Sequence, residues 1–215
     1  MSVNDDDRTR VLEQLLLHIE QLTAEDVQNL AQIRDIDWLA PLRNLRPERA
    51  VQEVRGLLEG PPDITVYLRR ITWFYTWLAW RQRLGPWLLF RIDVSAQHVD
   101  YNVVLRRLLR EQPPVSRPVA LGVWRDRGAF YACMIVNRTS PYRRKLVVLP
   151  FVLWSGWPFV ATYVGTGDEM PTLLTCLAVA LRGATVELVG ELHVDLESVV
   201  RAGYQDVGAP VALCI

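Results

Sequence analysis

Cysteine is scarce in this chain of 215 residues, and its pattern argues against two classes of small protein. Only Cys133, Cys176 and Cys214 are present, widely separated and without a Cys-x-x-Cys pair. A disulfide framework and a structural zinc site both need more cysteines at closer spacing. The scarcity indicates a reducing compartment, and we expect Cys133 and Cys176 to be buried and unreactive.

The chain also lacks a long apolar run. Its longest charge-free apolar stretch, Ile71–Trp80, is about half of the ~20 residues that a membrane-spanning helix needs. The first ten residues are polar and acidic, so we expect no secretory signal. The histidines His18, His98 and His193 fall in separate predicted elements, without metal-ligand spacing. No catalytic constellation emerges, so the sequence predicts a binding protein rather than an enzyme, with neither cofactor nor metal.

The net charge is zero, but the charges are unevenly distributed along the chain. Residues 1–63 carry 7 basic and 13 acidic groups, residues 64–150 carry 15 and 4, and residues 151–215 carry 2 and 7. The basic middle segment indicates a surface for a polyanion, beside acidic surfaces that suit a basic partner. The alternative is that these segments form solvated faces that pair with one another in the fold.

Apolar residues at helical spacing dominate the first 84 residues. We expect short helices that begin after Asp7, after Thr23 in a capping box with Asp26, and at Arg46–Pro47. Their number and length are typical of a death-fold bundle. A longer helix, from Asp63 to about residue 84, is apolar around most of its circumference, so we expect it to be buried between the two halves of the protein.

The remaining residues have β character. Two hairpins are predicted, one turning at Arg125–Gly128 and the other at Ser155–Gly156. A helix near 99–111 precedes them; a helix from Met170, a strand from Thr185 and a helix capped by Asp195 follow. The order predicts an α+β protein, with a helical domain over 1–84 and a domain over 85–215 built on an antiparallel sheet covered by helices on one face.

Patterns of aromatic and apolar positions over nearly the whole chain resemble a known family. They comprise the helical stretch Arg10–Glu59 with Asn44–Val51, then Gly85–Ile92, Leu146–Phe151, Trp157–Val160, Pro171–Leu181 and Asp195–Val200. With this order of elements, the chain resembles the N-terminal part of the centromere protein N family of inner-kinetochore subunits.

The resemblance implies a pyrin-like helical domain followed by a mixed α/β domain. It also implies a nuclear protein of the centromere that binds nucleosomes containing the centromeric histone H3 variant. In that family acidic residues near the start of the first helix contact a basic histone loop, and basic residues along a groove hold the DNA. A further C-terminal region pairs with a related subunit, here one resembling centromere protein L, and would begin near residue 215.

Candidate site residues follow from both lines of reasoning. The histone contact maps to Asp5, Asp6 and Asp7. The resemblance places DNA-facing residues at Arg46, Arg49, Arg110, Arg138 and Arg143, and the predicted elements add Arg106, Arg107, Arg144 and Lys145. We expect Arg106, Arg107 and Arg110 to share the solvent side of the helix near 99–111. Four positions depart from the family's pattern, because Arg10 stands near a second acidic position and Asp168, Glu169 and Asp195 stand where the family tends to be basic.

Two other functions remain open. A protein-interaction adaptor would use the death-fold-like helices to bind a similar domain, without nucleic acid. An enzyme with an unrecognised site is the third. One continuous basic groove across both halves would favour the nucleosome interpretation, whereas scattered arginines would favour the adaptor.

Overall fold

The computed structural model describes residues 5–61, 63–93, 100–112, 118–139, 144–165 and 170–207. Helices and strands follow in the order α1 (Asp5–Glu20), α2 (Ala24–Ala31), η1 (Asp37–Asn44), η2 (Pro47–Arg49), α3 (Ala50–Glu59), α4 (Ile64–Trp80), β1 (Trp87–Ile92), α5 (Tyr101–Arg110), β2 (Pro118–Asp126), β3 (Ala129–Thr139), β4 (Arg144–Trp154), β5 (Phe159–Tyr163), α6 (Met170–Ala180), β6 (Val186–His193) and α7 (Leu196–Val207). Within the described ranges no helix is long and apolar enough to cross a bilayer. The protein is α+β, as predicted.

The six strands form one antiparallel sheet in the order β2-β3-β4-β5-β1-β6. Both predicted hairpins are confirmed, and the first turns tightly because Arg127 and Gly128 have positive φ angles of 44° and 80°. Strand β1 comes before the hairpins in the chain but lies between β5 and β6. Strands β2 and β6 therefore form the two edges of the sheet.

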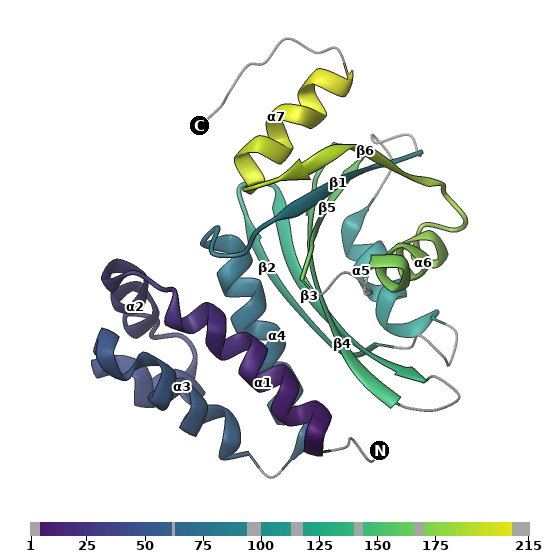
Figure 1. Ribbon diagram of the computed structural model, residues 1–215. Helices are drawn as coiled ribbons and strands as arrows, with labels where there is room; N and C mark the ends of the chain where they lie inside the picture. Colours follow the sequence, from purple (N-terminus) through teal and green to yellow (C-terminus); the bar gives the residue numbers. More distant parts are fainter. Residues whose placement is uncertain are drawn as a thin grey trace.

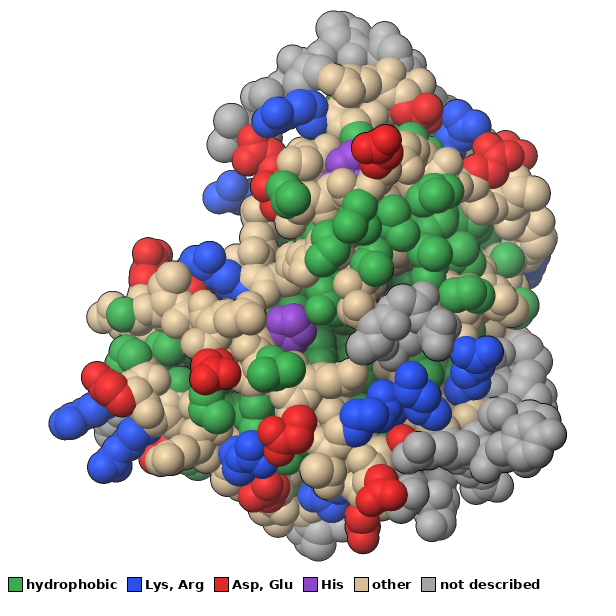
Figure 2. Space-filling model, viewed as in Figure 1, with side chains coloured by type: hydrophobic (Ala, Val, Ile, Leu, Met, Phe, Trp, Pro, Cys, Tyr) green, Lys and Arg blue, Asp and Glu red, His purple; other side chains and the backbone are tan. Residues whose placement is uncertain are grey.

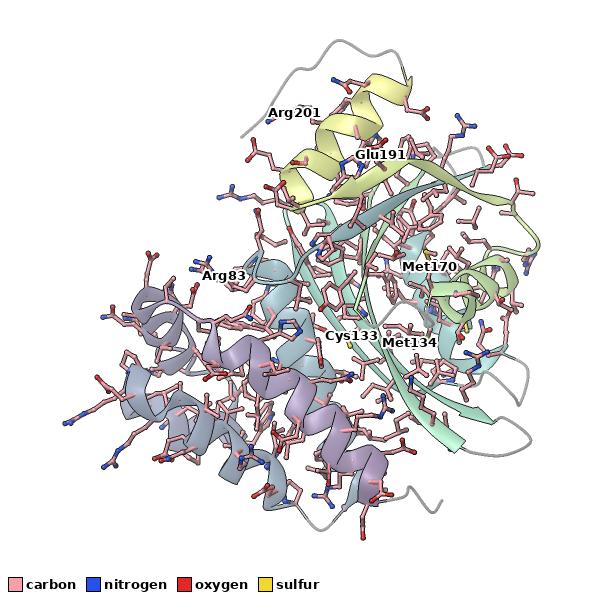
Figure 3. All side chains as sticks on the ribbon, viewed as in Figure 1. Arg83, Cys133, Met134, Met170, Glu191 and Arg201 are labelled. Carbon is pink, nitrogen blue, oxygen red and sulfur yellow. The ribbon has the colours of Figure 1, made fainter. Side chains whose placement is uncertain are left out.

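Helices cover both faces of this sheet, so the expectation of one covered face is wrong. Helices α1, α4 and α7 lie on one side, and α5 and α6 lie on the other (Figure 1). Neighbours on β3 show the division, because Cys133 belongs to the core under α4 whereas Met134 belongs to the core under α5 and α6 (Figure 3). Helix α6 is strongly apolar and buries Leu173, Cys176 and Leu177, which closes the second face.

Helix α4 is the layer between the other N-terminal helices and the sheet, as predicted. It packs on α1 and α3 on one side and on β2, β3 and β4 on the other. Phe74 and Trp77 are almost fully buried, whereas Trp73 is half-buried and lies against Trp38 at 5.3 Å between ring centroids. The helix ends at Trp80, earlier than expected. The predicted division after residue 84 falls in the connection from α4 to β1, and helices and sheet share one core across it.

Helix starts account for much of the local agreement between sequence and structure. Thr23 and Asp26 form the predicted capping box of α2, and Asp195 accepts a hydrogen bond from the Ser198 amide at 2.7 Å. The prediction that Asp7 caps the first helix is wrong, because α1 already begins at Asp5 and Asp7 is buried within its first turn. Proline at position 47 begins a short 3₁₀ turn that leads into α3, rather than an α-helical turn.

Close approach between α4 and β2 requires a glycine. A Cβ atom on Gly122 would lie 3.1 Å from backbone and side-chain atoms of Thr72, closer than ordinary van der Waals contact. Further along the same pair of elements, the rings of Trp80 and Trp124 lie 5.0 Å apart. The helix thus rests directly on the strand backbone at one point and on an aromatic pair at the next.

Replacement of Trp77 by alanine should lower the free energy of unfolding by about 3–5 kcal/mol, because it removes a buried indole from the layer between helices and sheet. Urea denaturation followed by circular dichroism measures this. Arg69→Ala, at an exposed position of the same helix, is the matched control and should change stability by less than ~0.5 kcal/mol. A midpoint little changed by Trp77→Ala would show that this side chain is not part of the core.

Candidate functional site

Basic residues gather at the end of the sheet where β3 ends and β4 begins. Arg138 lies opposite Lys145 in the antiparallel register, so two predicted DNA contacts are cross-strand neighbours. Arg138 is exposed and Lys145 is half-buried. Arg143 and the side chain of Arg144 lie outside the described residues. We call Arg138 and Lys145 the strand-end pair.

The start of α1 is tied to this same end of the sheet. A guanidinium nitrogen of Arg10 donates a hydrogen bond to the carbonyl oxygen of Leu146 at 2.6 Å, and it lies 3.3 Å from a carboxylate oxygen of Asp7. Arg10 is therefore used within the fold, and Asp7 is its buried partner. Of the three acids predicted to contact a histone, only Asp5 and Asp6 are exposed. These two carboxylates thus lie at the same end of the molecule as the strand-end pair.

Arg46 and Arg49 lie elsewhere. Both are exposed, in and just before η2, where they line a surface hollow with Leu45 and Glu53. Helix α3 follows them and runs alongside α1, with Arg55 bound to Glu13 and Arg8 bound to the Pro61 carbonyl. Because the end of α3 meets the start of α1, its beginning lies towards the opposite end of α1 (Figure 1). Arg46 and Arg49 are therefore separated from the strand-end pair by much of a helix length.

The arginines of α5 lie on the far face of the sheet from α1 and α4. Arg106 and Arg110 are exposed, as expected. Arg107 is not on the solvent side of the helix: it is half-buried, donates to the Ala180 carbonyl at 3.3 Å and lies 3.8 Å from Glu111. The expectation that all three share one solvent face is wrong for Arg107, because α6 packs against that side of α5.

The predicted basic residues therefore form separate groups. On the face drawn in Figure 2, Lys and Arg side chains occur in several places with Asp and Glu between them. Many other arginines are paired within the fold. Arg83, labelled in Figure 3, lies 2.8 Å from the buried carboxylate of Asp26, and Arg91 bridges Glu187 and Asp206. Burial alone would raise the pKa of Asp26, but hydrogen bonds from Thr23 and Arg83 lower it.

Sequence reasoning missed Arg125, which it placed in a hairpin turn. The structure puts Arg125 in β2, where a guanidinium nitrogen donates to the side-chain oxygen of Asn102 at the start of α5. The sequence contained a sign of this placement, because Leu121, Val123 and Arg125 are spaced two residues apart and so lie on one face of a strand. Arg10 was noted only as a departure from the family, although it fixes α1 to β4.

The thiols are buried as predicted. Cys133 and Cys176 have no exposed surface, and burial raises the pKa of the Cys133 thiol well above its usual value. Cys214 lies outside the described residues. Among the residues that the structure describes, no three His, Cys, Asp or Glu side chains are grouped so that they could hold a metal ion.

One hollow on the side of α1 and the sheet contains a titratable pair. His18 of α1 and Tyr163 of β5 lie 3.3 Å apart, Nε2 to Oη, beside Gln14, Leu17 and Tyr75. Burial lowers the pKa of His18, because the charged imidazolium is disfavoured away from water. In the neutral tautomer that carries its proton on Nδ1, Nε2 accepts a hydrogen bond from the Tyr163 hydroxyl.

Compared with models of protein families and with curated proteins, the chain matches none.

The free energy of unfolding should fall as the pH drops below about 6.5, because His18 has a lower pKa in the folded than in the unfolded chain and unfolding then takes up a proton. Urea midpoints of the wild type and of His18→Gln at pH 7.5 and 5.5 measure the effect. The wild type should lose more stability than the variant between these two values. Equal losses would show that protonation of His18 does not destabilise the fold.

Proposed function

We propose that this protein is a non-enzymatic chromatin component of the centromere that binds nucleosomes containing the centromeric H3 variant, through DNA-backbone and histone contacts. The observation that carries the proposal is the hydrogen bond from Arg10 to Leu146, because it joins the acidic start of α1 to the basic end of β3 and β4. A nucleosome offers DNA phosphates beside basic histone segments. A surface with exposed carboxylates next to cations is complementary to both.

The resemblance to the centromere protein N family supports the same proposal. We further propose that α1–α4 form a pyrin-like bundle, since they pack about a common apolar core at the length expected of that fold. The strand-end pair and Arg46 with Arg49 would contact separate phosphates, with Arg143 and Arg144 as further candidates. A partner subunit resembling centromere protein L, and location at the kinetochore, belong to the proposal on the resemblance alone.

An adaptor without nucleic acid is the second candidate, and a specific observation favours it. The basic residues lie in separate groups, and three arginines of the basic segment 64–150 pair with acids of the acidic segments on either side of it: Arg81 and Arg83 with Asp26, and Arg91 with Glu187. This arrangement is expected if the charged residues mainly keep the surface hydrated and form ion pairs between segments of the fold. A direct titration with DNA separates the two candidates.

Reversing the strand-end pair in Arg138→Glu/Lys145→Glu should weaken binding to duplex DNA of any sequence, because the contacts are to phosphates. Fluorescence anisotropy at several salt concentrations measures it. The slope of log affinity against log salt should become shallower by about 2, at roughly 0.9 per phosphate contact. The control is Arg182→Glu, which reverses one exposed charge in the turn after α6 instead of two, and it should bind like the wild type.

Thermal melting of each variant shows whether the fold survives the substitutions. Absence of measurable DNA binding by the folded wild type at low salt would remove the nucleosome proposal and favour the adaptor. Equal loss with Arg182→Glu would show that net charge, not this strand end, determines binding.

Changing Asp5 and Asp6 to asparagine should leave the DNA affinity nearly unchanged but reduce the preference for centromeric over ordinary nucleosomes, because both carboxylates are exposed at the start of α1. Competition between the two nucleosome types measures the preference. Asp7 is left intact since it is buried against Arg10. Glu20→Gln, exposed at the other end of α1, is the control. A wild type that binds both nucleosome types equally would contradict the histone contact.

A further inference from the structure

A groove lies between α5 and the edge strand β2. Strand β2 is the first in the sheet order, so its outer edge has no partner among the described strands. The groove measures about 600 Å³ and is lined by Asn102, Leu105, Arg106, Leu109, Leu121, Val123 and Arg125. It combines four aliphatic side chains with two cations and no carboxylate among these described lining residues.

The floor of the groove is apolar and partly open. Leu109 is 40 % exposed and Val123 is 38 % exposed, while Leu105 beneath them is buried. Leu105 and Leu109 are one helical turn apart, and Leu121 and Val123 share one face of β2, so the two pairs meet across the groove. Exposed apolar side chains beside a sheet edge favour association, and proteins usually avoid them unless a partner covers them.

Two guanidinium groups converge on one residue at the rim. Arg106 donates from Nε to the Asn102 carbonyl at 3.3 Å, and Arg125 donates to the Asn102 side-chain oxygen. The Arg125 guanidinium is also held 5.0 Å from the centre of the Phe130 ring. Both cations are therefore positioned in advance, which reduces the entropy that binding would otherwise lose.

No carboxylate forms an ion pair with either arginine among the described residues. Asp100 lies near, but its carboxylate accepts the Asn102 amide at 2.8 Å as the cap of α5. That backbone hydrogen bond is the main cause that lowers the pKa of Asp100, and the charge of Arg106 contributes less. Two like charges at one residue repel each other, so an added anion would be favourable there.

We propose that this groove binds an acidic amphipathic helix of a partner protein. Leucine-type side chains one turn apart would cover the floor, and carboxylates beside them would pair with Arg106 and Arg125. DNA is less suitable, because a phosphate backbone gains nothing from an aliphatic floor. The groove contains Arg106, one of the predicted DNA contacts, but not the strand-end pair or Arg46 and Arg49, on which the proposed nucleosome function depends. The inference therefore does not rest on that function.

A designed peptide tests the proposal. The probe is a fluorescein-labelled helical peptide of about four turns with leucines along one face and glutamates flanking them, and its matched partner carries lysine for every glutamate. Anisotropy titrations use the whole chain. The acidic peptide should bind saturably and weaken with salt, and the basic peptide should bind at least about tenfold more weakly.

Variants locate the site. Arg106→Glu/Arg125→Glu should weaken binding of the acidic peptide by about tenfold or more, and should let the basic peptide bind better. Leu109→Asp, at an exposed position, should also weaken binding of the acidic peptide, and it leaves the contact of Arg125 with Phe130 in place. This variant keeps the test valid if the double variant is unstable. Arg138→Glu/Lys145→Glu, with the same change of charge elsewhere, should bind the acidic peptide like the wild type.

Four outcomes would overturn the proposal. They are no saturable binding of the acidic peptide, equal binding of both peptides, unchanged binding by Leu109→Asp, or displacement of the peptide by a short DNA duplex. The last would mean that the groove belongs to a DNA-contacting surface. Failure of the wild type to bind DNA at all would remove the nucleosome proposal and leave this one standing, so the two can fail separately.

Discussion

The burial of α4 between two layers is the constraint on which the rest of the structure depends. Its apolar residues point both to the N-terminal helices and to the sheet, so neither side can be completed without the other. Polar contacts then fix the neighbours around it. The Tyr67 hydroxyl donates to the Arg8 carbonyl at 2.8 Å, and Arg10 joins α1 to β4. The surfaces formed by α1 and the strand ends are therefore rigidly related through this helix.

Features determined by nearby residues could be predicted from the sequence. The capping box of Thr23 and Asp26, the tight turn at Arg127–Gly128 and the all-round apolar α4 each depend on a few consecutive positions. Features determined by distant partners could not. The insertion of β1 between β5 and β6, and the covering of the second face by α6, depend on pairing between segments far apart in the chain. Periodicity shows that a helix has an apolar side but not which sheet face receives it.

The same distinction applies to the candidate site. Arg138 and Lys145 are neighbours because β3 pairs with β4. Neither of the two predicted hairpins contains that pairing, so the sequence suggested both residues as DNA contacts but did not predict that they lie opposite each other. The convergence of Arg106 and Arg125 on Asn102 could not be found from the sequence either, because it joins a helix to a strand reached after an intervening segment. Asp7 was misjudged for a related reason: a cap is a local device, whereas its burial depends on Arg10 and a carbonyl 136 positions beyond that arginine.

The glycine at position 122 affects more than packing. Antiparallel strands can slip by two residues and keep the same side chains on the same face, so apolar patterning alone does not select one register. Under α4, a slip of β2 relative to the helix would replace Gly122 by Ala120 or Trp124, and either side chain would meet the backbone of Thr72, from which a Cβ atom added at this position would lie only 3.1 Å away. The absence of a side chain at Gly122 thus favours one alignment of β2 along α4. The tight turn at Arg127–Gly128 fixes the pairing of β2 with β3, and the glycine favours the observed position of this edge strand under α4.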